Sequence, residues 1–299
     1  MITNQLSVSQ LDDVRRLETR CKEYDNLKGS LFLSGELNCD PELPCFYLLY
    51  NPERKTELIA FLSVFAPKPG EAEIYACTAP GFRCKGCFNT LLAQALHIIS
   101  DYGIRSLLFV HEPSSSACPA VLKSLNAEYA YSEYFMELSS PFQEDAPLPE
   151  GYALLCAGEA DLLCLSRLHA AAFEAAPEAS FHFLSAALSE TASYARMLMI
   201  KGNPDPVGCC FFTVGPKTLV IFGVAVHPAH RRKGCARAML TALLSDFSKN
   251  WPDFSVTLEV NSQNPAALSL YRELGFHITA QFDYSFADST ELLELFEEL

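Results

Sequence analysis

The sequence has no long hydrophobic run and few basic residues. No stretch approaches the ~20 consecutive apolar residues that a membrane-spanning helix requires, and the first residues lack the basic and apolar segments of a secretory signal peptide. Lysine and arginine total 22 against 36 aspartate and glutamate, a formal net charge of −14, whereas surfaces that bind nucleic acid are basic. We therefore expect a soluble, cytoplasmic protein that binds neither membranes nor nucleic acid.

Cysteine is plentiful, but paired metal-ligand spacings are absent. The 12 cysteines include one C-x-x-C pair, Cys84 and Cys87. No second pair and no C-x-x-H lies nearby, so the sequence predicts no metal site. Cys77, Cys164 and Cys209 lie inside apolar segments, which is typical of reduced thiols packed in a core.

Residues 224–236 join an apolar, β-branched run to a helix through a short basic loop. The run ends before Pro228, and apolar residues then recur at helical spacing from Met239. The only three consecutive cationic residues of the chain lie where this helix begins: Arg231, Arg232 and Lys233. Unpaired backbone N–H groups and the positive end of the helix dipole converge there, so the stretch predicts an anion site. Gly234 and Ala236 leave room for a phosphate against the backbone.

This stretch resembles the Q/R-x-x-G-x-G/A acetyl-CoA signature of the GNAT acetyltransferases, matched by Arg231, Gly234 and Ala236. Residues 264–276 resemble a second block of that family, N-x-x-A-x-x-L-Y-x-x-x-G-F. The resemblance covers roughly the last half of the chain, and it implies an acetyl-CoA-dependent N-acetyltransferase that uses no metal. It assigns the following residues to cofactor binding: Val224, Ala225, Val226, Arg231, Arg232, Lys233, Gly234, Cys235, Ala236, Asn264 and Ala267.

The signature loop has a second, weaker copy at residues 80–88. Placed beneath residues 228–236, the copy matches without a gap. The identical pairs are Pro80 and Pro228, Arg83 and Arg231, Lys85 and Lys233, Gly86 and Gly234, and Cys87 and Cys235. A repeat of this length indicates a duplicated domain, in line with 299 residues at ~150 per domain. Together with the resemblance, this predicts an α/β (α+β mixed-sheet) fold, a tandem duplicated GNAT fold.

The two copies differ in their chemistry. We expect a degenerate GNAT-like domain at 1–138, a linker rich in proline and acidic residues at 139–151, and a catalytic GNAT domain at 152–299. In the first copy Phe88 stands at the place of Ala236, where it would obstruct a phosphate. Val121 or Leu122 stands at the place of Tyr271. The first copy is therefore interpreted as structural or regulatory, with one acetyl-CoA expected per chain.

Apolar periodicity predicts the elements around these motifs. Helices are expected at 9–23, 89–100, 159–173, 180–190 and 265–274, and strands at 45–50, 58–65, 72–78, 152–156, 197–201, 208–214, 219–226, 254–260 and 276–286. Residues 291–299 are helical by composition, whereas the resemblance would make their start the closing strand of the sheet. We follow the resemblance at this point.

Acetyl transfer needs a donor at the carbonyl oxygen and a proton for the leaving thiolate. A backbone N–H on the splayed strand at 224–226 would serve as the oxyanion donor. Tyr271 is the predicted proton donor, since a phenol of reference pKa ~10 can donate to a thiolate whose conjugate acid has a pKa of about 8.5. The alternative role for Tyr271 is aromatic packing beside Leu268 and Leu274 on one helix face.

The acceptor amine must lose a proton before it attacks, and Glu259 is the predicted base. Strand alternation puts Val256, Leu258 and Val260 on one face and Glu259 on the other. By resemblance, Glu259 stands where family members that acetylate the N-terminal amine of ribosomal proteins carry a glutamate proposed as the base. An exposed strand glutamate without a catalytic role is the alternative.

Other residues compete for these roles. His169, His182 and His227 are rival bases, although a single histidine is more often a hydrogen-bonded structural residue. A covalent route through Cys235 or Cys209 is disfavoured, because the usual route of the family is direct attack.

The acceptor is predicted only by class. In the family's fold the first two helices shape the acceptor side, which here comprises residues 168–188. An acidic protein attracts cations over long range, so a small-molecule amine or a peptide N-terminus is expected, with a thiol or hydroxyl acceptor left open. The alternative function is a non-catalytic acyl-CoA-binding or assembly module. The sequence does not indicate an oligomeric state.

Overall fold

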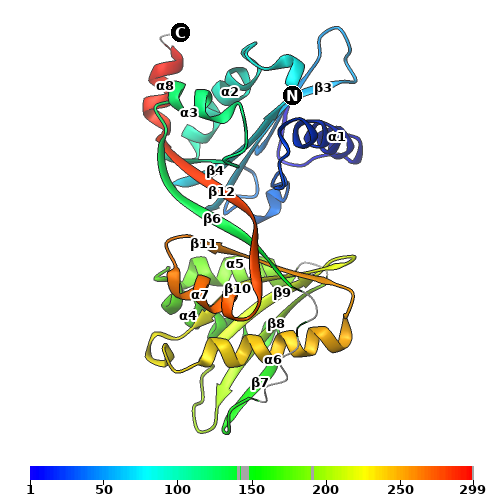
Figure 1. Ribbon diagram of the computed structural model, residues 1–299. Coiled ribbons are helices and arrows are strands. Elements are labelled where there is room, and N and C mark those ends of the chain that lie inside the picture. Colours follow the sequence, from blue (N-terminus) through cyan, green and yellow to red (C-terminus); the bar gives the residue numbers. More distant parts are fainter. Residues whose placement is uncertain (140–141, 143–147, 190–191, 298–299) are drawn as a thin grey trace. The chain divides into compact units, whose positions relative to one another are not determined.

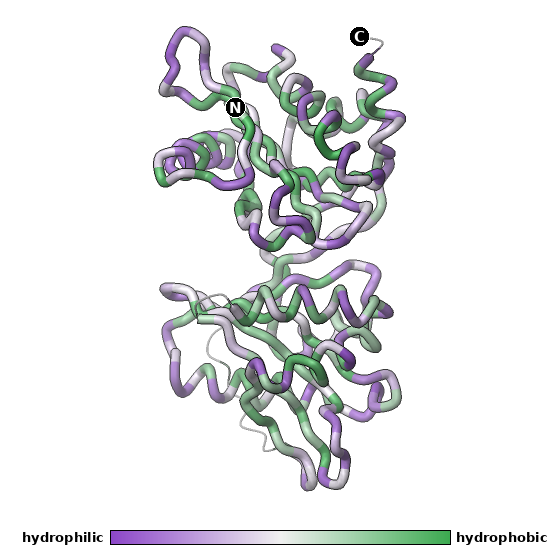
Figure 2. Tube along the Cα trace, turned by 180° about the vertical axis from the view of Figure 1, so that it is seen from behind, coloured by the Kyte–Doolittle hydropathy of each residue, from purple (hydrophilic) through white to green (hydrophobic). Residues whose placement is uncertain are grey.

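The computed structural model describes residues 1–139, 142, 148–189 and 192–297. These residues form two compact units. The first unit comprises Met1–Glu133 together with Ala280–Leu299, and the second comprises Tyr134–Thr279. Most of the predicted linker, 139–151, lies outside the described residues. In each unit hydrophobic residues gather along the strands, whereas hydrophilic residues dominate the connecting loops (Figure 2).

The first unit is a mixed sheet with helices packed against it (Figure 1). Its strands follow the order β1-β2-β3-β4-β5-β12-β6. They are β1 (Ile2–Thr3), β2 (Phe46–Tyr50), β3 (Leu58–Lys68), β4 (Glu71–Thr78), β5 (Ser106–His111), β6 (Glu128–Leu138) and β12 (Phe276–Asp288). Its helices are α1 (Val8–Asp25), α2 (Cys87–Asp101), α3 (Cys118–Ser124) and α8 (Ser289–Glu297). Only β4 and β5 are recorded as a parallel pair among the described pairings of this unit.

The second unit repeats this plan, with the strand order β6-β11-β10-β9-β8-β7. The strands are β7 (Tyr152–Ala157), β8 (Ser193–Ile200), β9 (Gly208–Val214), β10 (Thr218–Val226) and β11 (Ser255–Asn261). The helices are α4 (Leu162–Phe173), α5 (Pro177–Ser189), α6 (Cys235–Asn250) and α7 (Pro265–Glu273). Here β10 and β11 form the parallel pair. The predicted mixed sheet is confirmed, and the predicted strands and helices agree with these bounds to within a few residues.

Two strands serve both units. In β6 the residues up to Glu133 belong to the first unit and those from Tyr134 to the second. In β12 the residues from Ala280 belong to the first unit, where Asp283–Asp288 pair with β5. The compact units therefore differ from the sequence ranges 1–138 and 152–299, because the end of the chain completes the first sheet.

The closing-strand expectation for residues 291–299 is wrong. The described part of this segment is helix α8, which begins at Ser289. Leu292 is buried in the first core, and Leu295 and Phe296 pack against the same core. That spacing places the apolar residues on one helical face, and the composition of the segment indicated this correctly. The closing strand of the first sheet is the second part of β12.

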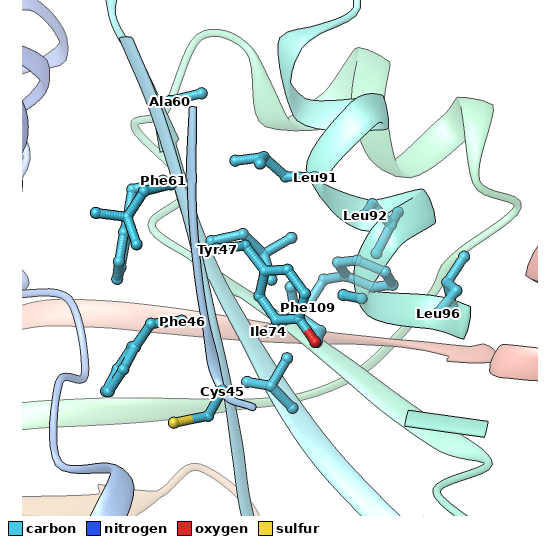
Figure 3. Packing of buried hydrophobic residues seen from close by; sticks show 14 of the residues in the cluster. Cys45, Phe46, Tyr47, Ala60, Phe61, Ile74, Leu91, Leu92, Leu96 and Phe109 are labelled. Atoms are coloured by element: carbon cyan, nitrogen blue, oxygen red, sulfur yellow. The ribbon is translucent and has the colours of Figure 1, made fainter. Parts of the chain in front are cut away.

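Side chains on successive strand residues point to opposite faces of the sheet, and apolar residues on both faces build the core. In β2 and β3, Phe46 and Phe61 point to one face of the sheet, whereas Tyr47 points to the other, toward Leu91 and Leu92 of α2 (Figure 3). This is the two-residue period of a strand that is covered on both faces.

The dependence of the first unit on β12 gives a prediction. A fragment of residues 1–138 should fail to fold cooperatively, because the edge of β5 that β12 covers would be left unpaired. The same fragment joined by a flexible linker to residues 280–297 should regain a cooperative thermal transition in circular dichroism. Equal melting of the two fragments would show that β12 is dispensable for this unit.

Candidate functional site

Strand β10 bends where the two parallel strands separate. β10 pairs with β11 from Thr218 opposite Ser255 to Ile221 opposite Leu258. On its other side the register against β9 shifts between Phe222 and Ala225. Gly223 lies in this β-bulge with a φ of 57°, a left-handed conformation that favours glycine. A bulge increases local twist and redirects the following residues, so β10 leaves β11 at this point.

The bulge also reverses which face of the sheet the strand's side chains occupy. Leu219 and Ile221, before the bulge, lie in the core cluster that contains Leu240 of α6. Ala225, after the bulge, lies in the cluster that contains Leu165 of α4. Without the extra residue, Ala225 would face the same side as Ile221. The glycine within an otherwise apolar strand is the sequence signal for this feature.

The backbone of Val226 faces the open side of β10. His227, its neighbour, donates its N–H to the Val207 carbonyl on the β9 side, at 2.9 Å. Because successive backbone groups point in opposite directions, the Val226 N–H and C=O point toward the side from which β11 has diverged. The Val226 carbonyl accepts from Arg231 Nε at 3.4 Å. Because the backbone groups alternate in direction, those of Ala225 point toward β9 and the amide of Val226 points to the open side.

The signature loop holds a left-handed, glycine-dependent conformation at the start of α6. Arg232 has a φ of 63° and Gly234 a φ of 77°. The first backbone bond of the helix is donated by Ala238 to the Gly234 carbonyl, at 2.9 Å. The amides of Cys235, Ala236 and Arg237 precede that bond and therefore have no intrahelical acceptor. The loop thus presents a row of N–H donors at the positive end of a helix dipole.

The basic side chains of the loop have distinct contacts. Arg231 donates to the Ala172 carbonyl at the end of α4 at 2.7 Å, in addition to its bond to Val226. Lys233 donates to the Ala229 carbonyl at 2.9 Å. These two cations brace the loop against its own backbone and against α4. Arg232 is exposed, and its side chain makes no hydrogen bond within the described part of the chain.

Helix α7 is fixed by capping and by an ion pair. The Asn264 side chain accepts from the Ala267 amide at 3.1 Å, which makes it the N-cap of this helix. Glu273 at the other end pairs with Arg237 in the first turn of α6. The ion pair links α7 to the signature helix.

Tyr271 of α7 is buried, with 6% of its surface exposed. It packs edge-on against Phe276, with ring centroids 6.0 Å apart. Burial raises the pKa of Tyr271 to about 12, and the thiol of Cys210, which lies on β9 opposite the bulge, adds to this rise. The phenol is therefore protonated at neutral pH and is available as a hydrogen-bond donor. Its hydroxyl makes no hydrogen bond to another described residue.

Glu259 lies on β11 one residue beyond the last pair with β10. Its side chain is exposed, whereas Leu258 and Val260 on the opposite face are buried. The predicted alternation is present for these residues, although Thr257, which shares a face with Glu259, is also buried. The carboxylate therefore lies at the open end of the parallel pair.

The rival groups lie in different surroundings. Burial lowers the pKa of His169 to about 4, and its Nδ1 lies 3.1 Å from the Ser180 hydroxyl. His227 accepts from the Ala229 amide, and His182 is exposed on α5. Cys209 is fully buried, and burial raises the pKa of its thiol. Cys235, with 2% exposure, contacts the Tyr152 hydroxyl.

The first unit contains a loop of the same conformation. Cys84 and Gly86 have φ values of 56° and 77°. Arg83 donates to the Thr78 carbonyl and Lys85 to the Gly81 carbonyl, as their counterparts do in the second unit. The duplication inferred from sequence therefore extends to backbone geometry and side-chain bonds.

The two loops nevertheless differ in their surroundings. Arg83 forms an ion pair with Asp25, whose side chain is only 3% exposed, and Asp25 also accepts from Ser116 at 2.7 Å. Phe88 packs partly against the first core. β4 pairs with β3 in regular register from Ile74 to Thr78, without a bulge. The role of Asp25 could not be inferred from the motif, because this residue lies 58 positions from Arg83.

Comparisons with known proteins agree with this architecture. Residues 163–276 match the family model of the acetyltransferase (GNAT) family. The chain is similar to the L-methionine sulfoximine/L-methionine sulfone acetyltransferase of Salmonella typhimurium, with 37% identity over 22% of this chain and 39% of that protein. It is also similar to the ribosomal protein bS18-alanine N-acetyltransferase of Escherichia coli, with 39% identity over 19% of this chain and 38% of that protein. The chain thus spans about two fifths of the length of these curated relatives.

Solved structures match over nearly the whole chain. A GCN5-related N-acetyltransferase from Sphaerobacter thermophilus has a TM-score of 0.75 at 19% identity, covering 95% of both chains. A tandem GNAT protein from the clavulanic acid biosynthesis pathway has a TM-score of 0.71 at 14% identity, covering 97% of this chain and 98% of its own. The predicted tandem fold is confirmed. In the described residues, no helix is long and apolar enough to span a membrane, and no group of three or more His, Cys, Asp or Glu side chains is placed to hold a metal.

Proposed function

This chain belongs to the GNAT acetyltransferase superfamily, and we propose that its second unit transfers an acetyl group from acetyl-CoA to an amine by direct attack. The observation that supports this most is the combination of the β10 bulge, the diverging parallel pair and the signature loop in one unit. Together they offer an accessible backbone amide beside a row of free helix N–H groups. The backbone amide can donate a hydrogen bond to the carbonyl oxygen of the acetyl group, and the helix N–H groups can donate to a diphosphate.

The acetyl-CoA would lie along the open edge of β10. Its diphosphate accepts from the amides at the start of α6, with Gly234, Cys235 and Ala236 as the closest backbone and Arg232 as the available side-chain cation. Arg231 and Lys233 contribute charge and hold the loop in shape. The segment Val224–Val226 lines the thioester, with the Val226 amide as the oxyanion donor. Asn264 and Ala267 form part of the wall along the pantetheine arm.

Tyr271 would stabilise the leaving thiolate as a hydrogen-bond donor. The pKa of Tyr271 is about 12, whereas that of a comparable thiol is about 8.5, so complete transfer of the phenol proton is uphill by roughly 5 kcal/mol. A short hydrogen bond that strengthens as charge develops on sulfur avoids this cost.

Glu259 would take the proton of the acceptor amine, directly or through water. The carboxylate is exposed at the open end of the parallel pair. The curated relatives are named for acetylation of L-methionine sulfoximine or L-methionine sulfone and of an alanine of ribosomal protein bS18. We therefore assign the acceptor to amines of this kind, a small amino compound or a peptide N-terminus.

The first prediction for this function concerns cofactor binding. Gly234→Val should weaken acetyl-CoA binding at least tenfold, because a branched side chain at a φ of 77° distorts the row of amides. Gly86→Val is the matched control, with the same φ in the other unit and open space around it. Calorimetry of the full chain should show a stoichiometry near one, lost in the first variant and retained in the second. Two sites per chain would contradict the assignment to the second unit.

A second prediction tests the thiolate donor. Tyr271→Phe should lower kcat by roughly 10²-fold, in line with the loss of one hydrogen-bond donor to a developing charge, with little change in acetyl-CoA affinity. Release of free CoA with a panel of amines measures the rate and identifies the acceptor together. Tyr194→Phe, at an exposed site on β8, is the control and should behave as the unaltered protein. No amine-dependent CoA release by any form would favour a non-catalytic acyl-CoA-binding module.

A third prediction tests the base. Glu259→Gln should remove the acidic limb of the pH dependence of kcat/KM, because the amide cannot accept the proton. His169 cannot supply a limb near neutral pH, since its pKa is about 4. A limb that survives in Glu259→Gln would therefore move the role to His182, His227 or solvent.

A further inference from the structure

The first unit contains a cavity of about 100 Å³ between α1, the ends of β4 and β5, and the loop that leads to α3. This volume has room for several water-sized molecules. Three of its lining residues are cysteines from three different elements: Cys21 of α1, Cys77 of β4 and Cys118 of α3. All three are free thiols. Acetyl transfer in the second unit makes no use of this cavity.

Cys21 lies beside a cationic group. Its Sγ donates to the Thr78 carbonyl at 3.4 Å, and Arg83 Nε donates to the same oxygen at 3.2 Å. The shared acceptor brings the guanidinium next to the sulfur. Arg83 is itself held by Asp25, which lies one turn further along α1. The bond from Sγ to the Thr78 carbonyl favours the protonated thiol, whereas the neighbouring Arg83 guanidinium favours the thiolate, the form that reacts with electrophiles.

Cys77 is the residue before Thr78, and its thiol interacts with that of Cys21. Both thiols line the same cavity. The neighbouring Cys77 thiol is the largest influence on the pKa of Cys21 and lowers it; burial opposes this shift, Arg83 adds to it and the Asp25 charge opposes it. The same interaction, together with burial and the Cys21 and Glu18 charges, raises the pKa of Cys77. One sulfur of the pair is thus set up as the nucleophile and its neighbour as a protonated thiol.

The other buried thiols lack this arrangement. Burial raises the pKa of Cys45 to about 11, and burial likewise raises the pKa of Cys118. The aligned repeats place His169 and Ala225 at the positions of Cys21 and Cys77, so the second unit cannot form an equivalent pair.

We propose that Cys21 and Cys77 are a peroxide-reactive thiol pair that closes to a disulfide between α1 and β4. The Cys21 thiolate attacks one oxygen of hydrogen peroxide, the O–O bond breaks, and the released hydroxide takes a proton to become water. The Cys77 sulfur then attacks the Cys21 sulfenic acid, and hydroxide leaves with the Cys77 proton as a second water. Two thiols are oxidised and one peroxide is reduced, so the step balances.

The experiment treats the full reduced chain with hydrogen peroxide and maps its peptides by mass spectrometry. The expected product is a peptide pair joined through Cys21 and Cys77, lighter by two hydrogens than the reduced pair. Cys21→Ser should abolish it. Cys77→Ser should leave a sulfenic acid at Cys21 that dimedone labels at least about tenfold faster than Cys118. Cys118→Ser, in the same cavity, should still form the disulfide.

Peptide mapping of the unaltered chain keeps the test decisive if a variant fails to fold. Oxidation of the exposed Cys84 or Cys156 while Cys21 stays reduced would overturn the proposal. A disulfide between any other pair would do the same. Acetyl transfer is not a readout here, so the proposed function and this proposal stand or fall separately.

Discussion

The separation of two parallel strands sets the layout of both units. β4 and β5 pair over Glu71–Ile74, and β10 and β11 pair over Thr218–Ile221, after which no further pair is recorded within the described residues. An unpaired strand edge inside a fold is costly unless its N–H and C=O groups find partners. The two units satisfy that requirement differently. In the second unit Arg231 donates to the Val226 carbonyl, whereas in the first unit Arg83 and Cys21 both donate to the Thr78 carbonyl.

The same loop thus has two uses. In both units the loop arginine bonds to the end of the unit's first α-helix, through Asp25 of α1 in one case and the Ala172 carbonyl of α4 in the other. This bracing involves neither a diphosphate nor an acetyl group, so the shared loop residues have a structural use at 80–88, where the partly buried Phe88 packs against the core. The strands before the two loops differ in one feature, the bulge at Gly223, which β4 lacks between Ile74 and Thr78.

The sequence predicts local features well and partners poorly. The strand, loop and helix around Gly234 follow from glycine, proline and apolar spacing, all of which act within a few residues. The position of β12 in the sheet does not follow from such local signals. Alternation of apolar and polar residues shows which face of a strand is buried but not which strand pairs with it. The pairing of Arg83 with Asp25 also escapes a motif, since residues far apart in sequence meet only in the fold. At the end of the chain the local signal was the better guide. Composition correctly indicates helix α8, whereas the family resemblance wrongly predicts a strand there.

In the candidate site, the sequence motifs identify residues but not their burial. The sequence motifs single out Tyr271 and Glu259, but no motif encodes that Tyr271 is buried and Glu259 exposed. Burial of Tyr271 raises its pKa to about 12 and turns a general acid into a hydrogen-bond donor, because the desolvated phenolate is disfavoured. His169 undergoes the opposite change for the same reason, since burial disfavours its cation.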